Sequence, residues 1–225
     1  MINWVVAAVI AGFTSFVATN IDDLVILIVF FSQINKSFRV RHILVGHTIA
    51  FIALILASLP GFFGGLFLPE EGIGLLGILP IAIGIRQLFQ SADDSDAVQT
   101  VSHELEHELD AVHSRGTRRS VLASVLVPQT YHVAVITFAN GGDNIGVYVP
   151  LFASSDLPSL LIIISLFLVL SLVWCFIAYY ITRHPILAPV VTRYGNRLVP
   201  FVLIGLGLYI LIENGTYRLL PAFQV

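Results

Sequence analysis

The sequence predicts an all-α integral membrane protein with six transmembrane helices, arranged as two inverted three-helix repeats. Three observations predict this fold. Of the 225 residues, 57% are hydrophobic and 11% are charged, against about 45–50% and about 25% in an average soluble domain. The mean hydropathy is +0.92 and the apolar residues form long runs. A polar motif recurs in both halves of the chain. This composition excludes a water-soluble globule and a disordered chain, and the net charge of −3 gives no basic surface for nucleic acid.

Six apolar runs approach or exceed the roughly 20 residues that a helix needs to cross a bilayer. They cover residues 2–32, 43–68, 73–89, 121–153, 157–182 and 198–212. The first run starts at the N-terminus, but it lacks the basic start of a signal peptide and is too long for one. The first and fourth runs are long enough to require a tilt or a break, and Gly141-Gly142 favours a break in the fourth.

The chain divides into three parts. Residues 1–90 are the first three-helix membrane repeat, residues 121–225 are the second, and residues 91–120 are an acidic, His-rich linker. Loops that retain Lys and Arg stay cytoplasmic. Ten of the eleven basic residues lie on the cytoplasmic side of the cell membrane if both termini are outside and the linker is cytoplasmic. With three spans each, the two halves enter the membrane in opposite directions, as in many secondary transporters that bind substrate near mid-membrane.

Two related polar motifs interrupt the apolar runs. They are Asn20-Ile21-Asp22-Asp23 in the first run and Asn140-Gly141-Gly142-Asp143-Asn144 in the fourth. Each Asp at the centre of a membrane helix opposes insertion by roughly 2.5–3.5 kcal/mol, and neither run carries a Lys or Arg to neutralise it. Such residues are kept where they face the bundle interior and meet a cation, a proton or water. The motifs therefore predict a cation site, with a structural hydrogen-bonded network as the alternative. The predicted ligands are Asn20, Asp22, Asp23, Asn140, Asp143 and Asn144.

Helical spacing indicates which of these side chains share a face. Asn140, Asp143 and Asn144 stand at i, i+3 and i+4, on one face of a helix. Asp22 points away from the corresponding face of the first run unless the backbone unwinds beside it. Carboxylate and amide oxygens suit calcium, manganese and magnesium, and paired carboxylates also attract zinc and cadmium. The cation is expected as the transported substrate, and no resident cofactor is expected.

The linker offers an accessory metal site. If it is helical, one side carries His103, Glu106, His107 and Asp110, which could capture a cytoplasmic metal ion. The alternative is a solvated connector, which fits the acidic composition of the stretch. The linker also matches the zinc-protease pattern His-Glu-x-x-His, but so short a soluble stretch cannot build a substrate cleft.

Three other side chains within or near the spans are interpreted as structural. His47 and His132 are expected to be structural, with a proton relay as the alternative. Cys175 is expected to be a buried apolar side chain. Small residues on the spans allow close helix packing within one chain or in a homodimer. They are Gly61, Gly64, Gly65, Gly205 and Gly207.

The two motifs are similar to the paired motifs of the CadD-type cadmium-resistance transporters, which belong to the lysine-exporter (LysE) superfamily. The resemblance runs over nearly the whole chain, from residue 2 to about residue 212, with the linker as the variable part. The second motif is the more specific, because it continues as Gly146-Val147-Tyr148-Val149-Pro150. The resemblance implies a six-span protein of two inverted repeats that exports divalent cations, with the Asn and Asp residues of both motifs as its site.

Together these features predict a secondary transporter rather than an enzyme. It exports divalent metal cations, in exchange for protons, across the lipid bilayer. The chain has neither an ATP-binding phosphate loop nor the phosphorylation motif Asp-Lys-Thr-Gly, so a gradient is expected to drive it. Cadmium is implied by the resemblance, and the ligand chemistry leaves manganese, calcium and zinc open. One alternative is an amino-acid exporter, which needs a basic group or helix N-terminus for the substrate carboxylate. The other is an intramembrane aspartyl protease built on two aspartates.

Overall fold

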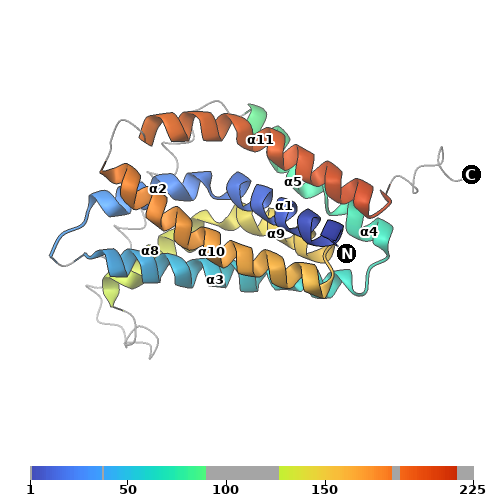
Figure 1. The fold of residues 1–225 in the computed structure, drawn as a ribbon, viewed down its shortest axis with the longest axis horizontal. Coiled ribbons are helices and arrows are strands. Elements are labelled where there is room, and N and C mark those ends of the chain that lie inside the picture. Colours follow the sequence, from blue (N-terminus) through green and yellow to red (C-terminus); the bar gives the residue numbers. More distant parts are fainter. Residues whose placement is uncertain (1, 37, 90–126, 184–187, 217–225) are drawn as a thin grey trace, which may run out of the picture.

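The computed structural model describes the backbone of residues 2–36, 38–89, 127–183 and 188–216. Within these ranges the regular elements are α-helices and none is a strand, which confirms an all-helical fold. The linker predicted at residues 91–120 lies outside the described residues. The helices are α1 (Ile2–Thr19), α2 (Ile21–Ser32), α3 (Val40–Gly65), α4 (Glu70–Leu75), α5 (Ile78–Phe89), α8 (Pro128–Asn140), α9 (Gly142–Ala153), α10 (Leu157–Thr182) and α11 (Ala188–Glu213) (Figure 1).

Three stretches are long and apolar enough to cross a membrane, namely α3, Gly72–Phe89 and α10. The bent pair of α1 and α2 makes a fourth if it counts as one span. Within the described residues, the α8–α9 pair is not among these stretches, and α11 contributes a shorter apolar helix, Val199–Glu213. Large apolar side chains such as Leu56 and Phe176 are exposed on the outer faces of α3 and α10, as expected where helices meet lipid. The helices therefore support a membrane protein, and six spans stays a prediction.

Both motif-bearing runs are broken, as expected from their length. α1 and α2 meet at an angle of 55°, and Asn20, with φ −115° and ψ 14°, is the single residue between them. α8 and α9 are separated by Gly141, with φ −77° and ψ 20°. A Cβ atom at position 141 would lie 2.2 Å from Leu54 Cδ1. Glycine at this break therefore allows α3 to pass close beside it.

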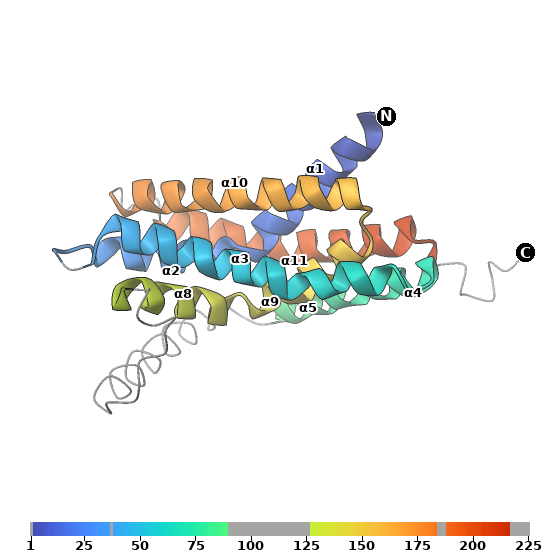
Figure 2. The ribbon, with the colours of Figure 1, turned by 90° about the horizontal axis from the view of Figure 1, so that it is seen from below.

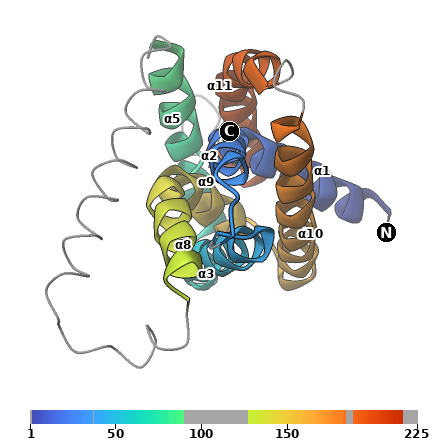
Figure 3. The same cartoon turned by 90° about the vertical axis from the view of Figure 1, so that its left-hand side faces the viewer.

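The packing of the long helices crosses between the two halves of the chain. α3 lies along α8 and α9, whereas α10 lies along α1 and α2 (Figure 2). α5 packs against α11, and Figure 3 shows this pair at one side of the bundle. The unbroken helix α3 of the first half thus lies along the broken pair α8–α9 of the second half. In the same way, α10 of the second half lies along the broken pair α1–α2 of the first half.

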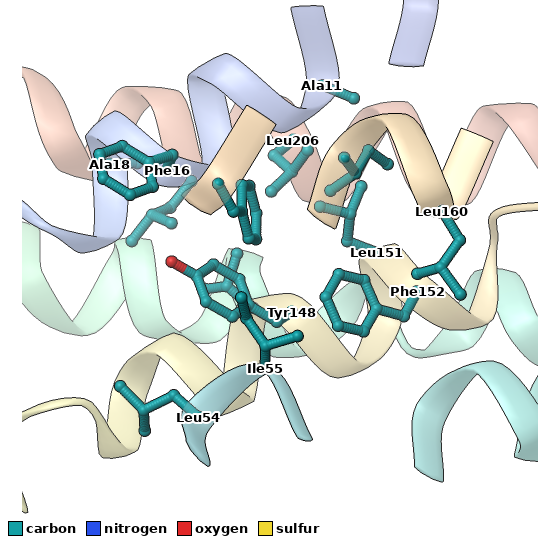
Figure 4. Close-up of a cluster of buried hydrophobic side chains, with 14 of the residues drawn as sticks. Ala11, Phe16, Ala18, Leu54, Ile55, Tyr148, Leu151, Phe152, Leu160 and Leu206 are labelled. Atoms are coloured by element: carbon teal, nitrogen blue, oxygen red, sulfur yellow. The ribbon is translucent and has the colours of Figure 1, made fainter. Parts of the chain in front are cut away.

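Aromatic rings from α1, α3, α9 and α10 fill the space between these four helices. The ring centroids of Phe16 and Phe51 are 5.6 Å apart, and those of Tyr148 and Phe167 are 4.5 Å apart. Tyr148 lies in this apolar cluster, and its hydroxyl oxygen is directed toward the side of α1 (Figure 4). Among the buried side chains of this cluster, Tyr148 alone carries a hydroxyl group.

Glycines set the distance between α3 and the broken pair of the second half. A Cβ atom on Gly61 would lie 2.4 Å from the Val149 carbonyl oxygen, and one on Gly65 would lie 2.4 Å from that of Ala153. The helix backbones are therefore in direct contact within the chain, as small residues in membrane helices allow. Among the described residues, a Cβ atom on Gly64 or Gly205 would meet nothing within 4 Å. The homodimer stays a prediction.

Candidate metal-ion site at the helix breaks

The two motifs, far apart in sequence, meet where their helices break. Asn140 at the end of α8 donates from Nδ2 to Asp23 Oδ1 at 2.8 Å and to Asp22 Oδ2 at 3.3 Å. Both carboxylates lie in the first turn of α2, immediately after the non-helical Asn20. The sequence required an unwound backbone for Asp22 to join the cluster, and the break at Asn20 supplies it. One amide therefore lies between two carboxylates of the other half.

Asp143 and Asn144 begin α9 on the other side of this contact. Asp143 is half-buried, and its Oδ1 accepts a hydrogen bond from the backbone N–H of Asn144 at 3.0 Å. Asp143 also interacts electrostatically with both Asp22 and Asp23. The three carboxylates thus form one negatively charged group, and repulsion between them favours a cation or protons at the same place.

Among the described residues, these carboxylates have no basic partner. The charges that act on Asp22, Asp23 and Asp143 come from one another, and no Lys or Arg contributes. Asp23 is 1% exposed. A buried carboxylate without a counter-ion is strongly unfavourable, so the arrangement is suited to receiving a positive charge from outside the chain.

Asn20 belongs to the same region but has different neighbours. Its Nδ2, which carries two hydrogens, lies within hydrogen-bond distance of three acceptors, the Phe16 carbonyl oxygen at 2.8 Å, Thr19 Oγ1 at 2.9 Å and Tyr148 Oη at 2.8 Å. Its backbone carbonyl oxygen accepts from Trp174 Nε1 of α10 at 2.6 Å. The helix break at Asn20 is therefore held by side chains from α9 and α10, both in the second half of the chain.

Three buried side-chain oxygens at the motifs have no hydrogen-bond partner in the described part of the chain. They are Asn20 Oδ1, Asp23 Oδ2 and Asn144 Oδ1. Asn144 is fully buried, and its side chain interacts with the Asp23 carboxylate. Leaving a buried polar group unsatisfied costs about 1–3 kcal/mol, and native proteins contain few such groups. Unpaired carboxylate and amide oxygens are the donors that hard divalent cations take.

Carboxylates alone do not complete a metal-binding group here. Within the described ranges, no three His, Cys, Asp or Glu side chains are gathered closely enough to hold a metal ion. The oxygens of Asn20, Asn140 or Asn144 would have to supply the remaining ligands.

The sequence profile of the cadmium resistance transporters matches residues 16–223. The chain belongs to the cadmium resistance transporter family. The matched range contains both motifs, both helix breaks, the last turn of α1 and the whole of α3, α9 and α10. Neither a curated protein nor a solved structure was found to match the chain. Membership makes the chain a membrane protein of metal efflux and cadmium resistance, which confirms the resemblance seen in its motifs.

Sequence reasoning missed two residues of this cadmium resistance transporter. Tyr148 stands four residues after Asn144, on the same face of α9, and this spacing could have identified it. Buried tyrosine hydroxyls usually have a hydrogen-bond partner, which makes Tyr148 in an apolar span informative. Trp174 of α10 has no comparable signal, because only the fold brings its N–H to Asn20.

The sequence analysis also made predictions for the linker, for Cys175 and for two histidines of the transporter. His103, Glu106, His107 and Asp110 lie outside the described residues. Cys175 is a fully buried free cysteine in an apolar cluster, as predicted. His47 is buried and stacks on Phe51, but its Nδ1 has no partner among the described residues. The ring of His132 lies 6.3 Å from that of Phe30. A proton relay through either histidine stays an untested alternative.

Proposed function

We propose that the protein exports divalent metal cations, Cd²⁺ among them, from the cytoplasm in exchange for protons. The site is formed by Asp22, Asp23 and Asp143 together with the amide oxygens of both motifs. The single observation that carries this proposal is the set of three buried, unpaired oxygens described above, in a chain of the cadmium resistance transporter family. A divalent cation would lose water and take these oxygens as ligands.

Alternating access is proposed to come from movement of one half against the other. The proposal of six spans in two inverted repeats is supported by the crossed packing, in which α3 lies along α8–α9 and α10 lies along α1–α2. A two-fold relation between the halves would exchange these contacts with one another. The breaks at Asn20 and Gly141 lie part-way along the bundle, where secondary transporters with inverted repeats bind their substrates.

The proposed orientation places the positively charged end of the bundle in the cytoplasm. Lys36 and Arg39 lie between α2 and α3, and Arg183 follows α10 at the same end. The opposite end carries Asp156 and the acidic start of α4, and α1 begins and α11 ends there (Figure 1). The positive-inside rule assigns the basic end to the cytoplasm, so both termini would be outside.

Uptake of radioactive Cd²⁺ into proteoliposomes tests the transport proposal. Purified wild-type protein is expected to give saturable uptake that excess Mn²⁺, Zn²⁺ or Ca²⁺ reduces in the order of their affinities. The Asp156→Asn variant is the control, because Asp156 is an exposed helix cap away from the motifs. Flux no higher than in protein-free vesicles would overturn the proposal. Flux of an amino acid in its place would favour the amino-acid exporter.

Proton exchange is tested separately with a pH-sensitive dye trapped in the vesicles. A Cd²⁺ gradient is expected to move protons in the opposite direction, since the carboxylates exchange the cation for protons in each cycle. An imposed pH gradient should drive Cd²⁺ against its own gradient, and a protonophore should abolish that drive. Cd²⁺ flux that leaves the internal pH unchanged would contradict proton coupling while leaving cation transport intact.

A further inference from the structure

Tyr148 joins the second half of the chain to the helix break of the first. Its side chain is fully buried, and its hydroxyl group lies 2.8 Å from Asn20 Nδ2 and 3.1 Å from Thr19 Oγ1. Figure 4 shows the hydroxyl oxygen leaving the aromatic cluster on the side of α1. The hydroxyl oxygen, the only polar atom of this large side chain, therefore forms its hydrogen bonds with the residues at the break.

The direction of each hydrogen bond follows from the number of available hydrogens. The Thr19 hydroxyl donates to the Ser15 carbonyl oxygen at 3.0 Å, so Tyr148 donates its own hydrogen to Thr19 Oγ1. Tyr148 Oη is then left to accept from Asn20 Nδ2. Because both Asn20 N–H groups are committed to acceptors on α1 and α9, the Asn20 amide has one orientation, with Oδ1 left unpaired.

Amide orientation matters because the two ends of an asparagine side chain have opposite polarity. The oxygen accepts and can bind a cation, whereas the NH₂ group only donates and would repel one. We propose that Tyr148 is a positioning residue of the cation site, which holds the Asn20 amide so that its oxygen is free for the transported metal. This inference rests on the proposed function. Tyr148 does not touch the cation and acts through Asn20.

The aromatic neighbours of Tyr148 make its hydroxyl group separable from its packing. Its ring stacks on Phe152 at a centroid distance of 6.1 Å and contacts Phe167 at 4.5 Å. Phenylalanine keeps both contacts and removes one oxygen. The Tyr148→Phe variant is therefore expected to fold, and its effect on transport reports on the hydrogen bond to Asn20.

The test is a double-mutant cycle on Cd²⁺ uptake, with Tyr148→Phe, Asn20→Ala and the double variant. Tyr148→Phe is expected to raise the KM for Cd²⁺ about tenfold, which corresponds to about 1.4 kcal/mol, with little change in the maximal rate. In the Asn20→Ala background the same substitution should leave KM unchanged. Tyr131→Phe is the matched control, because that tyrosine is exposed on α8. Thr19→Val removes another member of the network and should raise KM in the same direction.

Two outcomes overturn the inference. One is a Tyr148→Phe variant with the wild-type KM. The other is an equal rise in KM with and without Asn20, which means that Tyr148 acts on something else. In both cases wild-type uptake persists, so the proposed function stands. Wild-type protein that transports no Cd²⁺ overturns the proposed function, and this inference with it.

Discussion

Replacing Asp23 by asparagine is expected to abolish Cd²⁺ uptake in proteoliposomes, with a loss of at least about 100-fold at low Cd²⁺. Asp23 is buried and accepts from Asn140 through Oδ1, while its Oδ2 has no hydrogen-bond partner in the described part of the chain. A divalent ion about 4 Å from one carboxylate gains about 8 kcal/mol at an effective dielectric constant near 20, before desolvation is counted. Asparagine keeps the shape of the side chain and removes this attraction.

The same substitution is expected to stabilise the protein. Burying an uncompensated charge is unfavourable, and asparagine at position 23 still offers Asn140 an oxygen acceptor. Thermal unfolding in detergent should therefore show an unchanged or higher midpoint, which separates lost transport from lost folding. Asp156→Asn is the matched control, because Asp156 is exposed, caps α10 by accepting from Ser159 N–H at 3.1 Å, and asparagine caps helices equally well. Retained uptake in Asp23→Asn would contradict a role for this carboxylate in binding.

The Gly61→Ala substitution is expected to lower the stability of the bundle by roughly 3 kcal/mol or more, at the upper end for overpacked sites. The added Cβ atom would lie 2.4 Å from the Val149 carbonyl oxygen and 2.9 Å from its Cα. These are backbone atoms of α9, so no side chain can rotate away and α3 must separate from α9. Because Asp143 lies in the first turn of α9, transport should fall as well.

Gly64→Ala is the matched control on the same helix. A Cβ atom there meets nothing within 4 Å among the described residues, and alanine favours helix by up to about 1 kcal/mol over glycine. The midpoint of thermal aggregation, followed by size-exclusion chromatography after heating, should fall for Gly61→Ala and hold or rise for Gly64→Ala. Equal midpoints would mean that α3 and α9 are not in backbone contact.

The location of the candidate site could be predicted from the sequence, because the unfavourable free energy of placing an Asp in the membrane depends on that residue and the apolar run around it. An Asp in an apolar run has no favourable place in lipid, so Asp22, Asp23 and Asp143 had to turn toward the interior. The expected breaks in the two long runs followed from length and glycine content in the same way. The match of the family profile to residues 16–223 agrees with the motifs from which the resemblance was drawn.

Contacts between helices could not be read in this way. Nothing in the order of residues indicates that Asn140 bonds Asp22 and Asp23, whereas Asn20 bonds Tyr148 instead of a carboxylate. The two asparagines hold equivalent places in similar motifs and have different partners, because different helices pass beside each break. The same applies to Trp174, whose N–H reaches Asn20 only through the packing of α10.

Composition and spacing therefore establish an all-helical membrane protein with two polar motifs that must be shielded from lipid, since solvation energies depend on residue type alone. The fold establishes which partner each polar atom meets. It distinguishes Gly61, in contact with a backbone, from Gly64, which faces open space. Within the described residues, it also leaves three oxygens at the breaks without a hydrogen-bond partner. Hydrogen bonds and close packing act over a few ångströms between segments far apart in the chain, so they depend on how the helices are arranged in three dimensions.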